Sequence, residues 1–152
     1  MAGSQPGSRR MLLLTGTQLG VFSSKTAASL VRYCREEVVG VLDSKHAGRR
    51  LEKIIGCGDG IEIFGTFEQA LAKAAPNMLA IGVAPVGGGL AAQWRADIVA
   101  ALEAGLDVVA GLHVMLGEDD QVARAARRSG ARIFDVRRPP TGSRWPRCAR
   151  RT

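Results

Sequence analysis

Six short apolar runs, separated by stretches with helical periodicity, constrain this 152-residue chain more than any other feature of its sequence. Each run is a predicted strand, and the stretches between them are long enough to hold helices that cross to the next strand. The predicted strands are residues 11–14, 38–42, 61–64, 78–83, 107–110 and 132–136. This alternation predicts an α/β fold, a Rossmann-like three-layer sandwich around a mainly parallel six-stranded sheet, and right-handed crossovers favour the strand order 3-2-1-4-5-6.

Polar residues mark where several of the intervening helices should begin. Ser23 or Ser24 precedes the first helix, and Thr66 precedes a helix that Pro76 prevents from continuing. A further helix follows directly after the glycine-rich stretch, from Leu90 onward. The acidic run 118–120 should open the last helix, because negative charge is favoured at a helix N-terminus.

The domain boundaries follow from changes in composition. Residues 1–10 lack the apolar segment of a signal peptide and predict a disordered leader. Residues 11–136 form the predicted Rossmann-like domain, which is large enough for one core but not for two. Residues 137–152 are rich in arginine and proline without apolar periodicity, which predicts a disordered tail or a truncated linker.

The net charge of +7 does not indicate a nucleic-acid partner. Eight of the 21 basic residues lie in the two terminal stretches, so 13 remain between Met11 and Asp135 against all 14 acidic residues. That segment is near neutral and offers no basic face for phosphates. No apolar run approaches the roughly 18 residues of a membrane span, and the three cysteines lack metal-ligand spacing. We therefore expect no nucleic acid, no membrane and no metal, and a cytoplasmic location.

Met78–Gly89 joins a buried strand to a glycine-rich loop and the start of a helix. Backbone N–H groups of such loops, together with the helix dipole, can hold an anion. We therefore assign ligand contact to Pro85, Gly87, Gly88 and Gly89, although a loop without a ligand would have the same sequence.

The predicted strand order brings the loops after the first, fourth and fifth strands together at the switch point of the sheet. Gly16 and Gly111 belong to these loops, and His113 at the mouth of the cleft is the candidate acid or base. Asp43 ends the second strand, where it could hold ribose hydroxyls or cap the following turn, and both alternatives stay open. The spacing Gly16-x-x-x-Gly20 is not the dinucleotide fingerprint, which argues against a nicotinamide-dependent oxidoreductase.

Three further residues are candidates for contact with an anion. Lys25 and Thr26 resemble the end of a phosphate-binding loop, but Ser24 replaces its last glycine. His46, beside Lys45, is a candidate for anion contact rather than catalysis. A solvated surface position is the alternative for Lys25, and a surface position is also open for His46.

Several colinear segments resemble the N-terminal half of a bacterial and archaeal family, formerly of unknown function, that is associated with D-glutamate N-acetyltransferase of the DgcN type. The segments are 25–27, 30–33, 40–44, 46–48, 81–85, 87–88, 94–95, 105–109, 111–113 and 135–140. The resemblance implies a Rossmann-like domain followed by a P-loop-type domain, and transfer of an acetyl group from acetyl-CoA to a D-amino acid.

Only twelve residues follow Pro140, and they match nothing in that family. We expect that the P-loop-type half is absent, as in a truncated or frameshifted reading frame, and that this half is inactive alone. Surfaces normally covered by the second half would favour a homo-oligomer. The alternative is a stand-alone nucleotide-binding or regulatory module.

Overall fold

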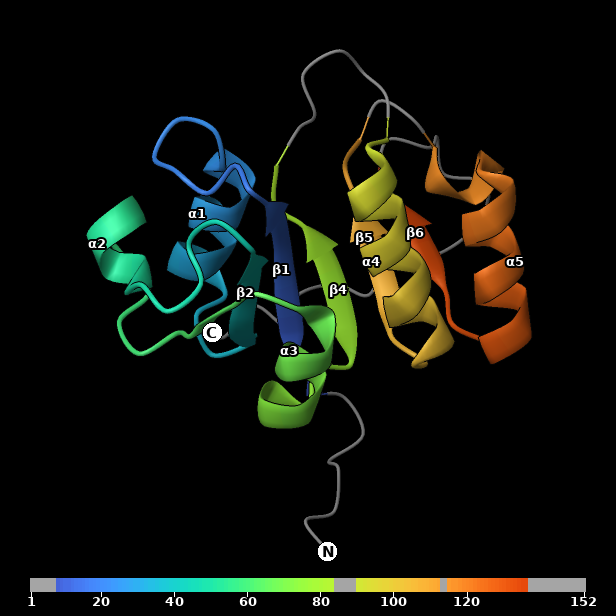
Figure 1. The fold of residues 1–152 in the computed structure, drawn as a ribbon, viewed down its shortest axis with the longest axis horizontal. Coiled ribbons are helices and arrows are strands. Elements are labelled where there is room, and N and C mark those ends of the chain that lie inside the picture. The colour runs from blue at the N-terminus through green and yellow to red at the C-terminus, as the bar shows by residue number, and fades with distance from the viewer. Residues whose placement is uncertain (1–7, 84–89, 113–114, 137–152) are drawn as a thin grey trace, which may run out of the picture.

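Six parallel strands form one sheet in the computed structural model, which describes residues 8–83, 90–112 and 115–136 (Figure 1). The strands are β1 (Met11–Gly16), β2 (Val38–Asp43), β3 (Ile63–Phe64), β4 (Met78–Ile81), β5 (Asp107–Ala110) and β6 (Ile133–Asp135). Their order is β3-β2-β1-β4-β5-β6, and every neighbouring pair is parallel. The predicted Rossmann-like order is therefore confirmed.

Helices cover both faces of this sheet (Figure 1). They are α1 (Lys25–Tyr33), α2 (Leu51–Ile55), α3 (Phe67–Ala74), α4 (Ala92–Glu103) and α5 (Asp120–Ser129), with a short 3₁₀ turn at Leu116–Glu118. The apolar residues of α1 and α2 join one buried cluster, whereas those of α3, α4 and α5 join the other. The sheet is thus the middle layer of three.

Alternate residues of β1 divide between these two cores. Leu12 and Leu14 pack with the α3–α5 cluster, whereas Met11 and Leu13 pack with the α1–α2 cluster. All six residues of the strand are buried. Because side chains of a strand point alternately to opposite faces, a run that is apolar throughout must be covered on both sides.

The helix starts differ from the predicted ones in their detail. Thr66 caps α3 as predicted, since its side chain accepts a hydrogen bond from the N–H of Gln69. Ser24 lies at the cap position of α1, but its hydroxyl bonds back to Gly20 and caps no helical N–H. Of the acidic run, Glu118 belongs to the 3₁₀ turn and Asp119 caps α5.

Part of the predicted leader and the predicted tail lie outside the described residues. Of the leader, the structure describes 8–10, where the N–H of Arg10 donates to the side chain of Asn77 at 2.9 Å. Residues 137–152 are not among the described ones. None of the helices in the described ranges has the length and apolar character needed to cross a bilayer.

Candidate functional site

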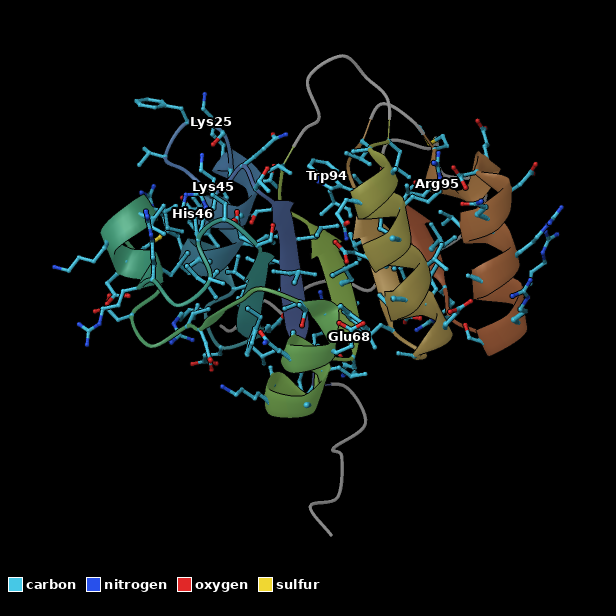
Figure 2. The ribbon with its side chains drawn as sticks, in the orientation of Figure 1. Lys25, Lys45, His46, Glu68, Trp94 and Arg95 are labelled. Atoms are coloured by element: carbon cyan, nitrogen blue, oxygen red, sulfur yellow. The ribbon has the colours of Figure 1, made fainter. Side chains whose placement is uncertain are left out.

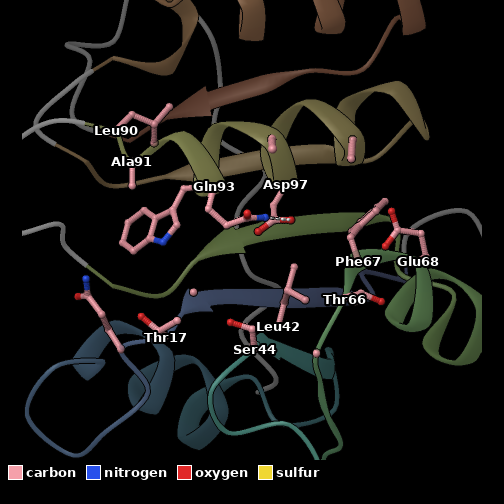
Figure 3. Close-up of a pocket in the computed structure, with 16 residues that line it drawn as sticks. Thr17, Leu42, Ser44, Thr66, Phe67, Glu68, Leu90, Ala91, Gln93 and Asp97 are labelled. Atoms are coloured by element: carbon pink, nitrogen blue, oxygen red, sulfur yellow. Dashed lines mark hydrogen bonds between the residues drawn. The ribbon is translucent and has the colours of Figure 1, made fainter.

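A cavity of about 1010 Å³ opens at the carboxyl ends of β1, β2 and β3, between α3 and α4 (Figure 3). Its walls are residues 16–18 after β1, Leu42 and Ser44 around the end of β2, and residues 65–68 at the start of α3. The lining is completed by Leu90 and Ala91 before α4 and by Gln93, Trp94, Ala96, Asp97 and Ala100 of α4. Ligands of open α/β sheets bind in this position, outside the carboxyl ends of the strands at the switch point. We refer to it as the α3–α4 cleft.

Trp94 and Gly16 meet across the α3–α4 cleft in a contact that only glycine permits. Gly16 has a φ of 67°, and a Cβ placed on it would lie 2.3 Å from Nε1 of Trp94. Trp94 is only 5% exposed and belongs to the core below, yet it also lines the cavity. Its indole N–H makes no hydrogen bond to any described residue.

The charged side chains among the described residues that line the cleft are two carboxylates, Glu68 and Asp97. Neither takes part in an ion pair within the described structure, and the one hydrogen bond recorded for Asp97 is a long one, 3.5 Å from Nε2 of Gln93. Burial raises the pKa of the Asp97 carboxyl, the Gln93 hydrogen bond opposes this, and the negative charge of Glu68 adds to it. Asp97 is half-buried and Glu68 is exposed, and neither has a cationic partner among the described residues.

Asp43 lies at the edge of the same site but is completely buried and fully bonded. One carboxylate oxygen accepts from the hydroxyl of Thr15 at 2.9 Å and the N–H of Leu19 at 3.0 Å. The other accepts from the N–H groups of Lys45 and His46, both at 3.0 Å, and from the His46 ring. We call these five bonds the Asp43 network. They favour the turn-holding alternative for Asp43, and ribose contact stays a prediction.

The ring of His46 is held in a defined orientation by this network. Its Nδ1 lies 2.9 Å from Oδ1 of Asp43, and its side chain is 13% exposed. Because an ionised carboxylate can only accept, Nδ1 is the donor in this contact. His46 is therefore positioned by Asp43, beside the α3–α4 cleft but not among the residues that line it.

The other predicted site residues are distributed unevenly around the cleft. Gly16 lines it directly, whereas Lys25 and Thr26 are exposed at the start of α1 and do not. Gly111 follows β5, where a Cβ would lie 3.2 Å from Val136, and it does not line the cleft. His113, the candidate acid or base, lies outside the described residues, as do Pro85, Gly87, Gly88 and Gly89.

Gly16 is the one predicted site residue among those that line the cleft in the described structure. Residues 65–68 directly follow β3, so the rule that placed Gly16 at the site applies to them as well. Asp97 lies one helical turn beyond Trp94, so the two residues share a face of α4. Both signals were present in the sequence, although neither distinguishes a cleft residue from an ordinary helix-surface residue.

No metal site is formed within the part of the chain that the structure describes. No group of three or more His, Cys, Asp or Glu side chains there is arranged to hold a metal ion. The α3–α4 cleft offers only the carboxylates of Glu68 and Asp97, whereas Ca²⁺ takes six or more oxygen ligands.

Comparison with known proteins places residues 44–139 in a family described as a domain of unknown function, the DUF1611_N Rossmann-like domain. A D-glutamate N-acetyltransferase from Tritonibacter scottomollicae is 31% identical over 129 residues, which cover 84% of this chain and 35% of that protein. One from a Pseudoalteromonas species is 29% identical over 132 residues, 86% of this chain and 36% of that protein. The chain thus spans about a third of the length of these curated relatives.

One solved structure is similar to this chain in both fold and sequence. The crystal structure of a DUF1611 family protein from Anabaena variabilis superposes with a TM-score of 0.78 at 32% identity. The match covers 88% of this chain and 38% of that one.

Proposed function

The chain belongs to the DUF1611_N family of Rossmann-like domains, and we propose that it is the N-terminal, ligand-binding half of an N-acetyltransferase. The reaction would move an acetyl group from acetyl-CoA to the amino group of a D-amino acid such as D-glutamate. The observation that carries this proposal is the colinear match with two proteins named D-glutamate N-acetyltransferase over 84% and 86% of this chain.

The charged side chains of the α3–α4 cleft do not favour the phosphate groups of acetyl-CoA. The starts of α3 and α4 border the cleft, but the charged residues described in its lining are the acids Glu68 and Asp97, whereas proteins usually pair phosphate with Arg or Lys. Lys25, Lys45 and His46 lie over α1 and the loop after β2, apart from Glu68 and Trp94 (Figure 2). The phosphate groups of acetyl-CoA therefore have no basic side chain to pair with among the described lining residues of this cleft.

The acidic lining of this cleft supports the proposal that the acetyl acceptor and the acetyl donor are bound by two different parts of a longer protein. An acidic cleft in this half suits the acceptor of the acetyl group better than its donor. The donor would then be held elsewhere, by the part of the curated relatives that this chain does not match. On this proposal the chain alone has no acetyltransferase activity, and His113 stays a candidate base for deprotonating the amine.

A chimera tests the proposal directly. The matching N-terminal segment of the Tritonibacter scottomollicae protein is replaced by this chain, and release of free CoA thiol is followed with D-glutamate and acetyl-CoA. We expect turnover by the chimera and none by this chain alone. The control reinserts the relative's own segment with the same junctions. A chimera that is folded by circular dichroism but inactive, beside an active control, would leave a stand-alone binding or regulatory module as the better explanation.

A further inference from the structure

One face of β5 and β6 is left uncovered by the helices that the structure describes. The strand register places Leu13, Ala80, Val109 and Phe134 in one row across β1, β4, β5 and β6. Leu13 and Ala80 belong to the buried α1–α2 cluster, whereas Val109 and Phe134 are half-buried and belong to neither cluster. Figure 1 shows α1 and α2 beside β1 and β2, and α4 and α5 at the β5–β6 end. The α1–α2 layer therefore ends before β5.

The other face of the same strands is covered. Val108, next to Val109 in β5, is fully buried and belongs to the cluster that includes residues of α4 and α5. The two valines point to opposite faces of the sheet. All-parallel sheets in proteins almost always have both faces covered, so we expect a further segment to cover Val109 and Phe134.

A cavity of about 580 Å³ lies on the uncovered face. Ala80, Val109 and Phe134 line it from the sheet, and Leu30 and Cys34 line it from the end of α1. We call this cavity the β4–β6 groove. These five side chains carry no charge, and a groove of this composition suits an apolar segment of a protein.

The charged residues that line the groove form two ion pairs. Arg132 lies 2.9 Å from Asp107, and Arg9 lies 3.8 Å from Glu37. Each pair is balanced, so the pairs offer no net charge to a small ion. Asp107 begins β5 and Met78 begins β4, which puts the groove toward the amino ends of the strands, whereas small ligands of open α/β sheets bind at the carboxyl ends. The groove therefore fits a protein segment better than a small ligand.

The part of the relatives that this chain does not match is available to cover the groove. The chain spans about a third of the length of the two curated relatives. Val136 follows β6, and its N–H donates to the carbonyl of Ala110 at 2.9 Å. Gly111 lies two residues after Val109, and a Cβ on it would be 3.2 Å from Val136, so Val136 lies on the face of Val109. A segment that continues from Val136 in a longer protein therefore starts on the uncovered face.

We propose that the β4–β6 groove is the docking surface for the part of the longer relatives that follows this domain, and that this part places an apolar segment over Val109 and Phe134. The assignment rests on the proposed function, in which the chain is one half of a longer enzyme. Two other occupants are a second copy of this chain and residues 137–152. The latter are rich in arginine and proline and lack apolar periodicity, which suits them poorly to this groove.

Thiol footprinting tests the docking surface, because the chain carries both a probe and a control. Cys34 lines the groove, Cys57 follows α2 and does not line it, and both are half-buried. Labelling of each cysteine with N-ethylmaleimide is followed by mass spectrometry in this chain and in the chimera described above. We expect Cys34 to react about tenfold more slowly in the chimera and Cys57 to stay within about twofold, since only the groove becomes covered.

A charge on the uncovered face should remove this protection. Val136→Glu places a carboxylate on the face of Val109 and Phe134, where an apolar segment would bury it. We expect Cys34 in the substituted chimera to react within about twofold of its rate in this chain alone. The matched control is Leu71→Glu, because Leu71 is 38% exposed against 40% for Val136 but belongs to α3, in the helix layer of the opposite face. It should keep the protection.

The same charge at the position aligned with Val136 in the intact Tritonibacter scottomollicae protein tests the surface without a chimera. We expect limited proteolysis to cut the substituted protein between its two parts more readily than the unsubstituted one. Equal resistance of the two proteins would overturn the docking surface.

The labelling outcomes separate the docking surface from the proposed function. Equal labelling of Cys34 in this chain and in a folded chimera would overturn the docking surface, and activity of that chimera would leave the proposed function intact. Protection of Cys34 in an inactive chimera would support the docking surface and count against the proposed function. Labelling of Cys34 that slows as the concentration of this chain rises would assign the groove to a second copy and overturn the proposal.

Discussion

The Asp43 network and the α3–α4 cleft lie at the same end of the sheet, but the acids in them are bonded in opposite ways: Asp43 is buried, whereas Asp97 is half-buried and Glu68 is exposed. Asp43 accepts five hydrogen bonds from its own chain. Glu68 and Asp97 share a cavity with a single long contact from Gln93. An acid whose oxygens are all bonded by the protein holds loops in place, whereas an acid without partners in a cavity is available to a ligand.

This comparison predicts that the two regions respond to substitution with opposite sign. Loss of an acid in the Asp43 network should destabilise the fold, because its donors would be left buried and unpaired. Loss of an acid in the cleft should leave the fold as stable or slightly more stable, because a repulsive charge disappears.

The largest effect is expected for Asp43→Ala. The substitution leaves the partly buried His46 ring and several backbone N–H groups without an acceptor, so the free energy of unfolding should fall by about 3–5 kcal/mol. Urea denaturation measures it, and Asp43→Asn, which keeps an oxygen, should cost less. Glu62→Ala, which removes an exposed pair with Lys73, is the control and should change stability by less than about 1 kcal/mol. A similar loss in both alanine variants would contradict the comparison.

The next largest effect is expected for Gly16→Ala at the junction of the two regions. The new Cβ would clash with the Trp94 indole and sit at a φ of 67°, so we expect a loss of about 1–3 kcal/mol. Gly56→Ala is a matched control, because Gly56 has a φ of 78° but no atom within 4 Å of its Cβ position. A double-mutant cycle with Trp94→Phe should recover part of the loss. Equal losses of stability in Gly16→Ala and Gly56→Ala would mean that the clash with Trp94 adds nothing to the cost of the positive φ.

Asp119 extends the comparison to an acid with partners on another helix. Burial raises the pKa of Asp119, but hydrogen bonds from Val122 and Arg95, the Arg95 charge and the Gln121 N–H lower it overall. The ionised form therefore stabilises the fold above pH 3.8, and this contribution is lost as pH falls through the folded pKa. Asp119→Ala should cost about 1 kcal/mol near pH 7 by removing the cap of α5. The cost should shrink in acid, and urea titrations at several pH values measure it. A cost that stays the same at all pH values would contradict this prediction.

The smallest effect, and the opposite sign, is expected for Asp97→Asn. The folded pKa of Asp97 is raised by burial, so this group favours the fold below pH 3.8 and loses that contribution as pH rises through the folded pKa. Near pH 7 the variant should therefore be more stable by about 0.5 kcal/mol, a small value because solvent screens a half-buried carboxylate. The gain should vanish in acid. Thermal unfolding at pH 7 measures this. A clear loss of stability in the variant would mean that Asp97 has a structural partner.

The strands of the sheet were predictable because they follow from local patterns. Apolar runs such as 11–14 are short and lie next to turn residues, which favours strands, and the strand order was predicted from the one hand of crossovers between parallel strands. Thr66 was predictable as a cap for the same reason, since the bond to Gln69 spans three residues.

The sequence by itself determined that the chain forms a parallel sheet covered by helices, because this depends on periodicity within single segments, and the right-handed crossovers favoured the strand order that the structure has. The tertiary structure alone decided that Trp94 lies against Gly16, that Asp43 is saturated by loops on both sides of it, and that Glu68 and Asp97 share one cavity. These contacts join residues that are far apart in the chain. A side chain's type limits the bonds it can make, but only the packing of distant segments determines which partners reach it.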